Sequence, residues 1–436
     1  MSKSTTGSAA RSSASSGRVK TIDIVNKGLK SRYRKEKRFR VYGLLSIIAS
    51  GVFLAFLLSS IVFNGYSAFL QTYIKLDVPV KTGMINEQNP RRSDFQGIIK
   101  AAIRDYFPDV TERRDKRELY SIFSSGAAFQ LREKVLKNPP EGDTTISLWV
   151  LADDDVDMLM KGHMKRDVPE SERRLSDKQL RWIEKLETDK RIEKRFNTTF
   201  FTAGDSREPE LAGIWGAVKG SFYTMIVTLV LSFPIGIAAA VYLEEFAPKN
   251  IATDFIEVNI NNLAAVPSIV FGLLGLAVFL SFFGMPRSTP LVGGIVLMLM
   301  TLPTIIIASR AALKAVPPSI REAALGVGSS KLQVITGHVL PLALPGMLTG
   351  TIIGMAQALG ETAPLLMIGM VAFIVDIPGG FTDPATVMPV QIYLWADSPE
   401  RAFVERTSAA IMVLLAFLVS MNAVAVIMRK RFERRW

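Results

Sequence analysis

Long apolar segments alternate with shorter polar ones along most of the chain. Six of these segments span residues 41–65, 217–243, 259–283, 290–312, 343–374 and 406–428. Each is long enough to cross roughly 30 Å of hydrocarbon as a helix. The pattern therefore predicts an all-α integral membrane protein with six transmembrane helices.

The region between the first two apolar segments has the pattern of a soluble domain. The run TTISLWVLA at 144–152 indicates a strand, and apolar residues at helical spacing over 170–196 indicate a helix. We therefore expect an α+β insertion over 72–212. The acidic DDDVD at 153–157 lacks the glycine and distal glutamate of an EF-hand loop, so a solvated turn is favoured over a calcium site.

The distribution of charge predicts the orientation in the membrane. The first 40 residues hold twelve Lys or Arg against two acids, and the chain ends in RKRFERRW. An even number of spans puts both basic tails on one side, which the positive-inside rule makes cytoplasmic. Because the positive charge lies at the membrane edge, it does not indicate a nucleic-acid partner. The predicted regions are a disordered tail (1–40), the first span (41–71), a periplasmic domain (72–212), a transmembrane domain (213–430) and a basic tail (431–436).

Composition excludes several kinds of chemistry. The chain has no cysteine, and its two histidines, His163 and His338, lie far apart in sequence. GVGSSK at 326–331 resembles a phosphate-binding loop in composition but lacks the G-x-x-x-x-G-K-[ST] spacing. We therefore expect no metal, no cofactor and no catalytic site, so the chain is not expected to be an enzyme.

Prolines and ionisable residues interrupt the predicted spans. Pro267, Pro303 and Pro364 each remove a backbone donor, which is tolerated in lipid only where the freed carbonyl faces protein or water. Each proline fits either a transport pathway or ordinary kinked packing. Glu361 either lines a pathway or anchors neighbouring helices, and Arg310 either extends to the membrane surface or supplies a pathway cation.

The cytoplasmic loop 313–342 predicts a docking element. A Pro-Pro turn, a short amphipathic helix from about Ser319, a glycine break and a second helix precede Pro341. Two short helices that lie across the cytoplasmic face would fit a partner's groove.

Part of this loop, REAALGVGSSKLQVITGHVLP at 321–341, resembles the EAA loop by which ABC importer permeases dock on their cytoplasmic ATPase. His338 stands where that loop usually has isoleucine. Glu322 would cap or brace the first helix, and Gly328 would permit the turn between helices. The resemblance implies an ATPase-coupling role for Arg321, Glu322, Ala323, Ala324, Gly328, Leu340 and Pro341.

Three further motifs resemble the phosphate permease (PstA) family over about 213–430: AVYLEEFAP at 240–248, AAVPSIVFGLLG at 264–275 and GETAPLL at 360–366. The resemblance implies the type I ABC importer permease fold in a bacterial inner membrane. It also implies a PstC-like second permease, two PstB-like ATPase subunits and a PstS-like periplasmic phosphate-binding protein. Gln357 stands where many phosphate permeases carry arginine. The implied substrate-pathway residues are Asn262, Pro267, Ser268, Arg310, Gln357, Gly360, Glu361 and Thr362.

Other functions remain open at this point. An ABC permease for molybdate, sulfate or phosphonate would share the same coupling loop. An ion-coupled secondary carrier would transport without an ATPase. A membrane-anchored sensor or scaffold would use residues 72–212 as its receptor and would keep its function when the EAA loop is altered.

Overall fold

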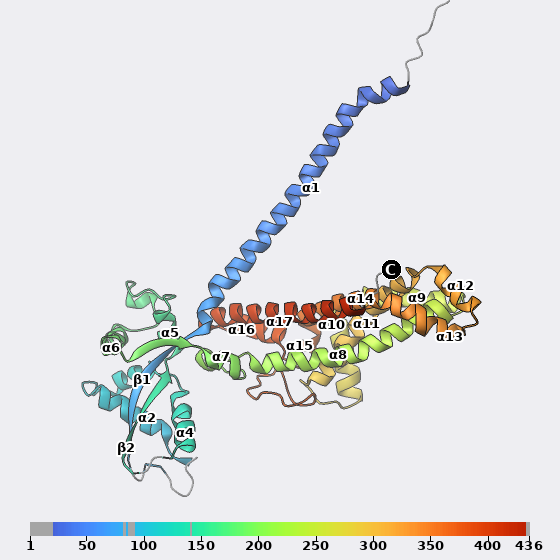
Figure 1. Cartoon of the computed structure of the whole chain (residues 1–436). Coiled ribbons are helices and arrows are strands. Elements are labelled where there is room, and N and C mark those ends of the chain that lie inside the picture. Colours follow the sequence, from blue (N-terminus) through green and yellow to red (C-terminus); the bar gives the residue numbers. More distant parts are fainter. Residues whose placement is uncertain (1–20, 82–83, 86–91, 140–141, 433–436) are drawn as a thin grey trace, which may run out of the picture. The chain divides into compact units, whose positions relative to one another are not determined.

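The computed structural model describes residues 21–81, 84–85, 92–139 and 142–432, which form two compact units, Met1–Ser60 and Ile61–Trp436. The first unit holds most of α1 (Thr21–Gly65), a continuous helix of 45 residues (Figure 1). Residues 21–40 were predicted to be part of a disordered tail, and this prediction is wrong. Their many Lys and Arg residues favour helix and no proline interrupts them, whereas the rest of the tail, 1–20, lies outside the described residues.

A three-stranded antiparallel sheet follows α1 and the 3₁₀ turn η1 (Tyr66–Phe69). Its strands are β1 (Leu70–Val80), β2 (Thr144–Leu151) and β3 (Ile192–Phe196), in the order β2-β1-β3. The predicted strand at 144–152 is confirmed. The predicted helix over 170–196 is too long, because the chain turns at Lys190 with a φ of 52° and then enters β3.

Short helices cover the sheet and complete an α+β domain. In α2 (Phe95–Tyr106) one apolar stripe packs onto the core around Ile74 and Leu76 of β1. The buried residues of this helix follow the helical period and are Phe95, Ile98, Ile99, Ala102 and Ile103. The other helical elements of this domain are α3 (Arg113–Tyr120), α4 (Ala127–Lys137), α5 (Asp154–Met160), η3 (Glu170–Glu172), α6 (Asp177–Thr188), α7 (Thr198–Thr202) and η4 (Pro209–Leu211).

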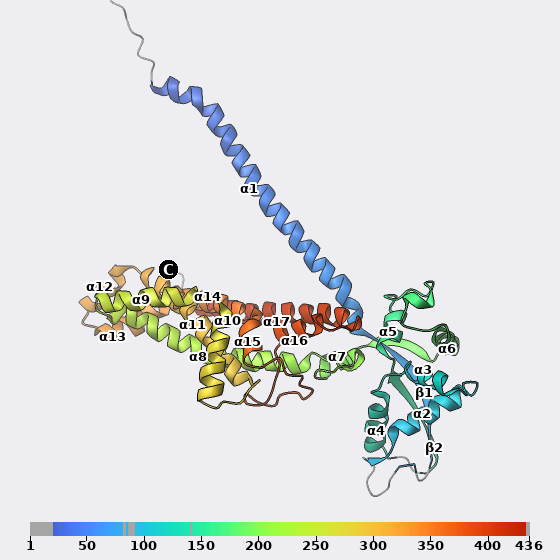
Figure 2. The same ribbon diagram turned by 180° about the vertical axis from the view of Figure 1, so that it is seen from behind.

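A helical bundle forms the rest of the second unit (Figures 1 and 2). It contains α8 (Trp215–Val241), η5 (Tyr242–Phe246), α9 (Ile251–Ala264), α10 (Ser268–Leu274), η6 (Gly275–Phe282), α11 (Pro290–Lys314), α12 (Pro318–Gly326), α13 (Lys331–Val334), η7 (Ile335–Val339), α14 (Leu340–Gly360), α15 (Ala363–Met367), α16 (Met388–Ala396) and α17 (Ala402–Phe432).

The central helix of the bundle is α11, which packs between α8 and α14. Small residues let the backbones approach closely, as is usual between membrane helices. A Cβ added at Gly294 of α11 would lie 2.5 Å from Val227 of α8, and one added at Gly350 of α14 would lie 2.2 Å from the Cβ of Ala308 of α11. The positions of these glycines therefore determine how α8, α11 and α14 are spaced.

Five helices among the described residues are long and apolar enough to cross a membrane, or six if one bent pair counts as a span. The bent pair corrects the predicted third span, because α9 and the α10–η6 segment meet at 103° instead of forming one helix over 259–283. The predicted fifth span, 343–374, is also wrong. The long helix there runs over Lys331–Gly360, so it begins earlier than predicted and continues through Pro341 without a break. It also ends earlier, because the backbone at Glu361 is extended.

The soluble domain and the bundle are joined by a buried polar network, referred to below as the junction network. Lys161 Nζ lies 2.6 Å from both Asp157 Oδ2 of α5 and Glu405 Oε1 of α17. Glu405 Oε2 accepts a hydrogen bond from Ser67 Oγ at 2.9 Å and lies 3.3 Å from His163 Nε2. Nearby, Arg406 Nη2 donates to Gln71 Oε1 at 2.5 Å. The network fixes the first strand and α5 of the domain to the start of α17.

Lys161→Met should destabilise the protein strongly, because it leaves Asp157 and Glu405 buried without their cation. The side chains of Lys161 and Glu405 are only 2% and 6% exposed, and breaking such a pair costs about 3–5 kcal/mol. Lys137→Met is the matched control, since Lys137 pairs with Glu133 at the surface, and we expect its change to stay within about 0.5 kcal/mol. Thermal unfolding of the purified protein in detergent measures both, and equal midpoints for the two variants would contradict the assigned role.

Candidate functional site

The loop between α11 and α14 is built from two short helices with well-defined ends. Pro318 begins α12 at a position where its missing N–H costs nothing. The helix ends in a Schellman turn, in which Ser329 N donates to Ala324 O at 3.2 Å and Gly328 N donates to Leu325 O at 2.9 Å. Gly328 has a φ of 89°, which explains the glycine. A capping box between Ser330 and Gln333 then starts α13.

One face of this loop packs into the bundle and the other is exposed. Ala324 and Val334 are buried in a core with Leu313 and Met347. Position 338, where isoleucine was expected to pack, holds an exposed His338, and the neighbouring Val339 is fully buried in its place. The exposed face carries Glu322, Leu325, Val327 and Leu332.

Arg321 braces α12 from below instead of projecting from the exposed face. Its guanidinium donates to Glu245 Oε1 of η5 at 2.8 Å and to the carbonyls of Val316 and Leu313 at 2.7 and 3.0 Å. Arg321 therefore ties α12 to the ends of both α8 and α11. Of the predicted coupling residues, Glu322 and Ala323 lie on the exposed face, Ala324 is buried, and Leu340 and Pro341 lie in the first turn of α14.

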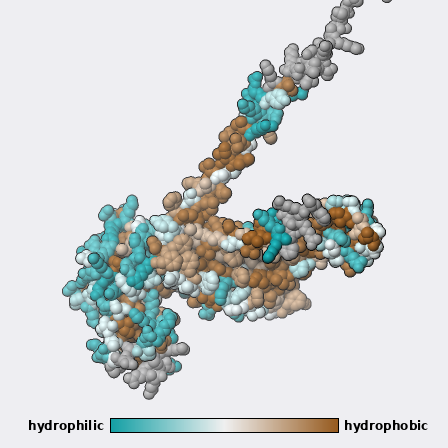
Figure 3. Space-filling model, viewed as in Figure 1, coloured by the Kyte–Doolittle hydropathy of each residue, from teal (hydrophilic) through white to brown (hydrophobic). Residues whose placement is uncertain are grey.

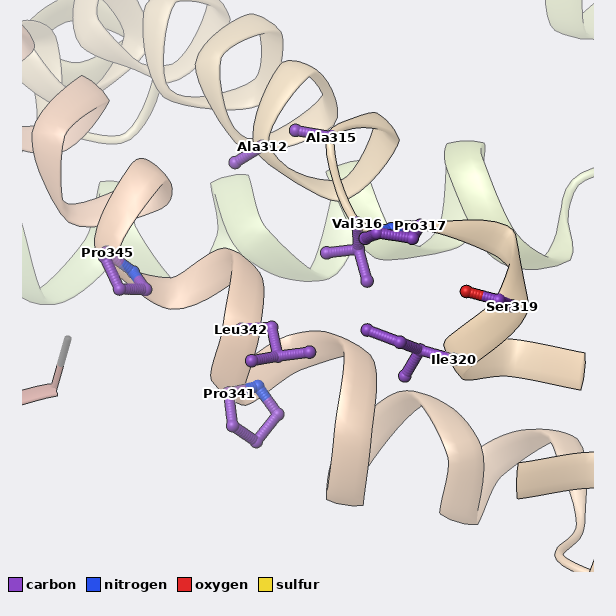
Figure 4. A pocket seen from close by; sticks show the side chains of 9 residues that line it. All are labelled: Ala312, Ala315, Val316, Pro317, Ser319, Ile320, Pro341, Leu342 and Pro345. Atoms are coloured by element: carbon purple, nitrogen blue, oxygen red, sulfur yellow. The ribbon is translucent and has the colours of Figure 1, made fainter. Parts of the chain in front are cut away.

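An apolar pocket of about 510 Å³ lies behind the loop, between the end of α11, the start of α12 and the start of α14 (Figure 4). Val316, Pro317 and Ile320 face Leu342 and Pro345 across it, and Pro341 lies at its edge. Its lining includes no charged side chain. The pocket is therefore unsuited to an anionic substrate.

The two helix breaks lie next to each other in space. The first interrupts the chain at Ala265–Pro267, and the second falls at Glu361 and Thr362, between α14 and α15. Helix α10, which follows the first break, packs directly on α15, which follows the second. A Cβ added at Gly272 would lie 2.6 Å from the Cα of Pro364, so only glycine permits this approach. Two interruptions that are about 95 residues apart in sequence thus form one site.

Most predicted pathway residues lie around these breaks and face outward from the chain. Asn262, Pro267, Gln357 and Gly360 are exposed, and Ser268, Glu361 and Thr362 are half-buried. A surface that carries polar groups at helix breaks requires a partner or water to cover it in a membrane.

Arg310 lies apart from this group, in an ion-pair cluster that the sequence analysis missed. Its Nη2 lies 2.5 Å from Glu257 Oε1 of α9, and its Nε lies 3.4 Å from Glu244 Oε2 of η5. Lys314 Nζ also lies 3.6 Å from Glu244. The positive charge of Arg310 is thus already paired with the carboxylates of Glu257 and Glu244. The paired glutamates of AVYLEEFAP were the available signal, since acids at the end of an apolar segment need a cation nearby.

A cluster of half-buried acids lies in the soluble domain, where the sequence predicted a solvated turn. The carboxylates of Asp153, Asp154 and Asp155 lie within 4.8 Å of one another, because these residues begin α5. Burial raises the pKa of Asp153 to about 8 and that of Asp155 to about 6, and the neighbouring Asp154 charge contributes to both shifts. Burial also raises the pKa of Glu210 to about 7, although Ser124 donates to its Oε1 at 2.6 Å.

The cluster predicts a pH-dependent stability of the domain. Because the folded-state pKa of Asp153 lies above the unfolded value of about 3.9, the folded state binds more protons and loses stability as the pH rises from about 4 to about 8. Asp153→Asn stays neutral and can still cap α5. The unfolding midpoint of this variant relative to the native protein should therefore be higher at pH 8 than at pH 5. Asp109→Asn, at an exposed position, is the control. A relative midpoint that does not change with pH would contradict the assignment.

Comparison with known proteins agrees with the architecture. Residues 232–436 match the family model described as "Binding-protein-dependent transport system inner membrane component", and residues 26–170 match a "Domain of unknown function (DUF3333)". The chain belongs to this family of ABC transporter permeases, which are multi-pass, non-catalytic inner-membrane components.

Several of the similar proteins are named as permeases of phosphate transport systems. The phosphate transport system permease protein PstA 1 of Mycobacterium tuberculosis is 30% identical over 225 residues, which is 51% of this chain and 72% of the relative. PstA of Yersinia pestis is 30% identical over 215 residues, covering 49% and 71%. The probable ABC transporter permease protein YqgI of Bacillus subtilis is 33% identical over 167 residues, which is 38% of this chain and only 56% of the relative's length. A solved chain of the inward-facing MetNI methionine ABC transporter aligns with 51% of this chain and 98% of its own length, at a TM-score of 0.41 and 19% identity.

Proposed function

We propose that this chain is a permease subunit of an ATP-driven phosphate importer. The observation that carries the proposal is the pair of adjacent helix breaks, of which the second is formed by GETAPLL at 360–366. Relatives named as phosphate transport permeases align with this half of the chain at about 30% identity. Permeases of this class do not hydrolyse ATP themselves, so uptake requires a separate ATPase subunit.

The proposed assembly contains a second, PstC-like permease, two PstB-like ATPase subunits and a PstS-like binding protein. In this arrangement the bundle adopts the six-span type I fold, with α9 and α10–η6 counted as one broken span. Both termini and the α12–α13 loop face the cytoplasm, and the domain from about residue 70 to residue 212 faces the periplasm. The outward-facing break residues would then meet the second permease, and the pathway would run between the two chains.

In the proposed coupling, the ATPase grips the exposed face of α12. Glu322 offers a carboxylate there, and Leu325 and Val327, which are 52% and 83% exposed, offer the apolar contact of a helix seated in a groove. Arg321 would pass the movement of α12 to α8 and α11 through the contacts described above. Leu340 and Pro341 would connect the loop to α14.

In the proposed pathway, phosphate is handled mainly by neutral donors from this chain. Gln357, Thr362 and Ser268 provide amide and hydroxyl groups near the breaks, and Glu361 lies half-buried beside them. Arg310 is held by Glu244 and Glu257, so the cationic contacts to the anion would come from the second permease. Asn262, Pro267 and Gly360 would shape the exposed rim of the same site.

The substrate is tested by reconstituting the full complex in proteoliposomes. Phosphate, delivered by the binding protein, should stimulate ATP hydrolysis and accumulate inside the vesicles, whereas molybdate, sulfate and phosphonate should not. Stimulation by one of these other oxyanions, but not by phosphate, would show that this oxyanion is the substrate. Uptake that continues without the ATPase subunits would indicate an ion-coupled carrier, and phosphate sensing without uptake would indicate a sensor.

The coupling role is tested by a matched pair of glycine substitutions. Gly326 and Gly328 both have open space where a side chain would begin, but only Gly328 has a positive φ, of 89°. Gly328→Val should therefore strain the turn by about 1–3 kcal/mol and lower phosphate-stimulated ATP hydrolysis about tenfold, whereas Gly326→Val should change it less than about twofold. Unchanged activity in a correctly inserted Gly328→Val protein would contradict coupling through this turn.

A further inference from the structure

An aromatic surface lies on the outside of the soluble domain, next to the first residues of the membrane helices. This surface, the aromatic patch, consists of Tyr66, Phe69, Leu70, Phe196 and Phe201. Phe196 is 59% exposed, Tyr66 56% and Leu70 38%, whereas Phe69 and Phe201 are half-buried. Large apolar groups exposed together in this way usually mark a contact surface.

Four members of the patch form one continuous surface, and Tyr66 lies in the same 3₁₀ turn as Phe69. The ring of Phe201 stacks on the ring of Phe196, with centroids 5.6 Å apart, and on the ring of Phe69, also at 5.6 Å. Leu70 of β1 is the direct partner of Phe196 in the antiparallel pairing with β3. Directly opposed residues project from the same face of a sheet, so Leu70 extends the stack of rings.

Two contacts place the patch at the level where the spans begin. Phe201 lies two residues before Ala203, whose carbonyl accepts a hydrogen bond at 3.2 Å from the backbone N–H of Trp215, the first residue of α8. On the other side, Leu70 precedes Gln71, which accepts from Arg406 in the second turn of α17. Figures 1 and 2 both show α7, which contains Phe201, at the end of α8 and beside the strands.

At this level, polar groups lie inside and apolar groups lie outside. The junction network of Lys161, Glu405 and Ser67 is enclosed by protein, while the aromatic patch is uncovered. A domain surrounded by water would show the opposite arrangement. In Figure 3 the soluble domain is largely hydrophilic and the bundle largely hydrophobic.

We propose that the aromatic patch inserts into the headgroup region of the bilayer leaflet on the domain's side of the membrane. Tyr and Trp are enriched at this depth because each combines an apolar ring with one polar atom, which suits Tyr66. The purely apolar Phe and Leu side chains of the patch would lie among the first carbons of the lipid chains. Trp215, which begins α8, is itself 40% exposed, so the apolar surface of that span starts at the level of the patch. Lipid contact and the junction network together hold the domain against the bundle.

The proposal can be tested with single labels, because the native chain contains no cysteine. Leu70→Cys and Phe196→Cys place an NBD fluorophore in the patch. Leu136→Cys is the matched control, since Leu136 is 37% exposed and Leu70 is 38% exposed. Leu136 lies at the far end of the domain: Lys134 Nζ donates to Ser147 O, and Ser147 pairs with Asp77, seven residues along β1 from Leu70.

The labelled chains are assembled into the complete transporter in lipid nanodiscs and quenched in two ways. Lipids with a doxyl group at acyl carbon 5 should quench the label at positions 70 and 196 about threefold more strongly than at 136, and aqueous iodide should show the reverse order. If iodide quenches the label at 70 and 196 as strongly as at 136, the patch is exposed to water and the proposal is wrong. Protection from both quenchers would overturn it by showing a protein partner. The two patch positions serve as independent readings if one variant folds poorly.

Discussion

A membrane helix can break only where protein or water satisfies the freed backbone groups, and this constraint organises the bundle. The chain breaks near Ala265 and again at Glu361, and the two segments that follow, α10 and α15, pack against each other. Gly272 makes that packing possible because a side chain would collide with Pro364. The polar residues around the breaks consequently occupy one surface of the chain. A pathway shared between two permeases needs its polar groups on such a surface.

Ion pairs connect the helix before the first break to the α12–α13 loop. Arg321 holds α12 to Glu245, and the adjacent Glu244 pairs with Arg310, which in turn holds Glu257 of α9. Helix α9 ends at the first break. A series of charged contacts therefore runs from α12 through η5 and α11 to α9.

The sequence predicted the features that depend on local pattern. Hydropathy located the membrane segments, alternation located β2, and spacing located the turn at Gly328, where the structure shows a positive φ. It failed where tertiary contacts decide. The bend of 103° at the first break depends on packing between α10 and α15, and the continuation of α13 into α14 depends on burial of Val334 and Val339. The acids at 153–155 appeared solvated because their burial comes from elements distant in sequence. Arg310 appeared available for substrate because Glu257 is 53 residues away.

The central claim is that the exposed face of α12 is the surface on which an ATPase docks, and site-specific cross-linking tests it most directly. Because the chain has no cysteine, Val327→Cys, at a position 83% exposed, gives a single reactive site. Phe282→Cys, at a position 80% exposed beyond the opposite end of α11, is the control. We predict that a short cross-linker joins the ATPase subunit to residue 327 and not to residue 282, with a yield that changes when ATP is bound. Absence of a product at 327, or equal products at both positions, would contradict the claim.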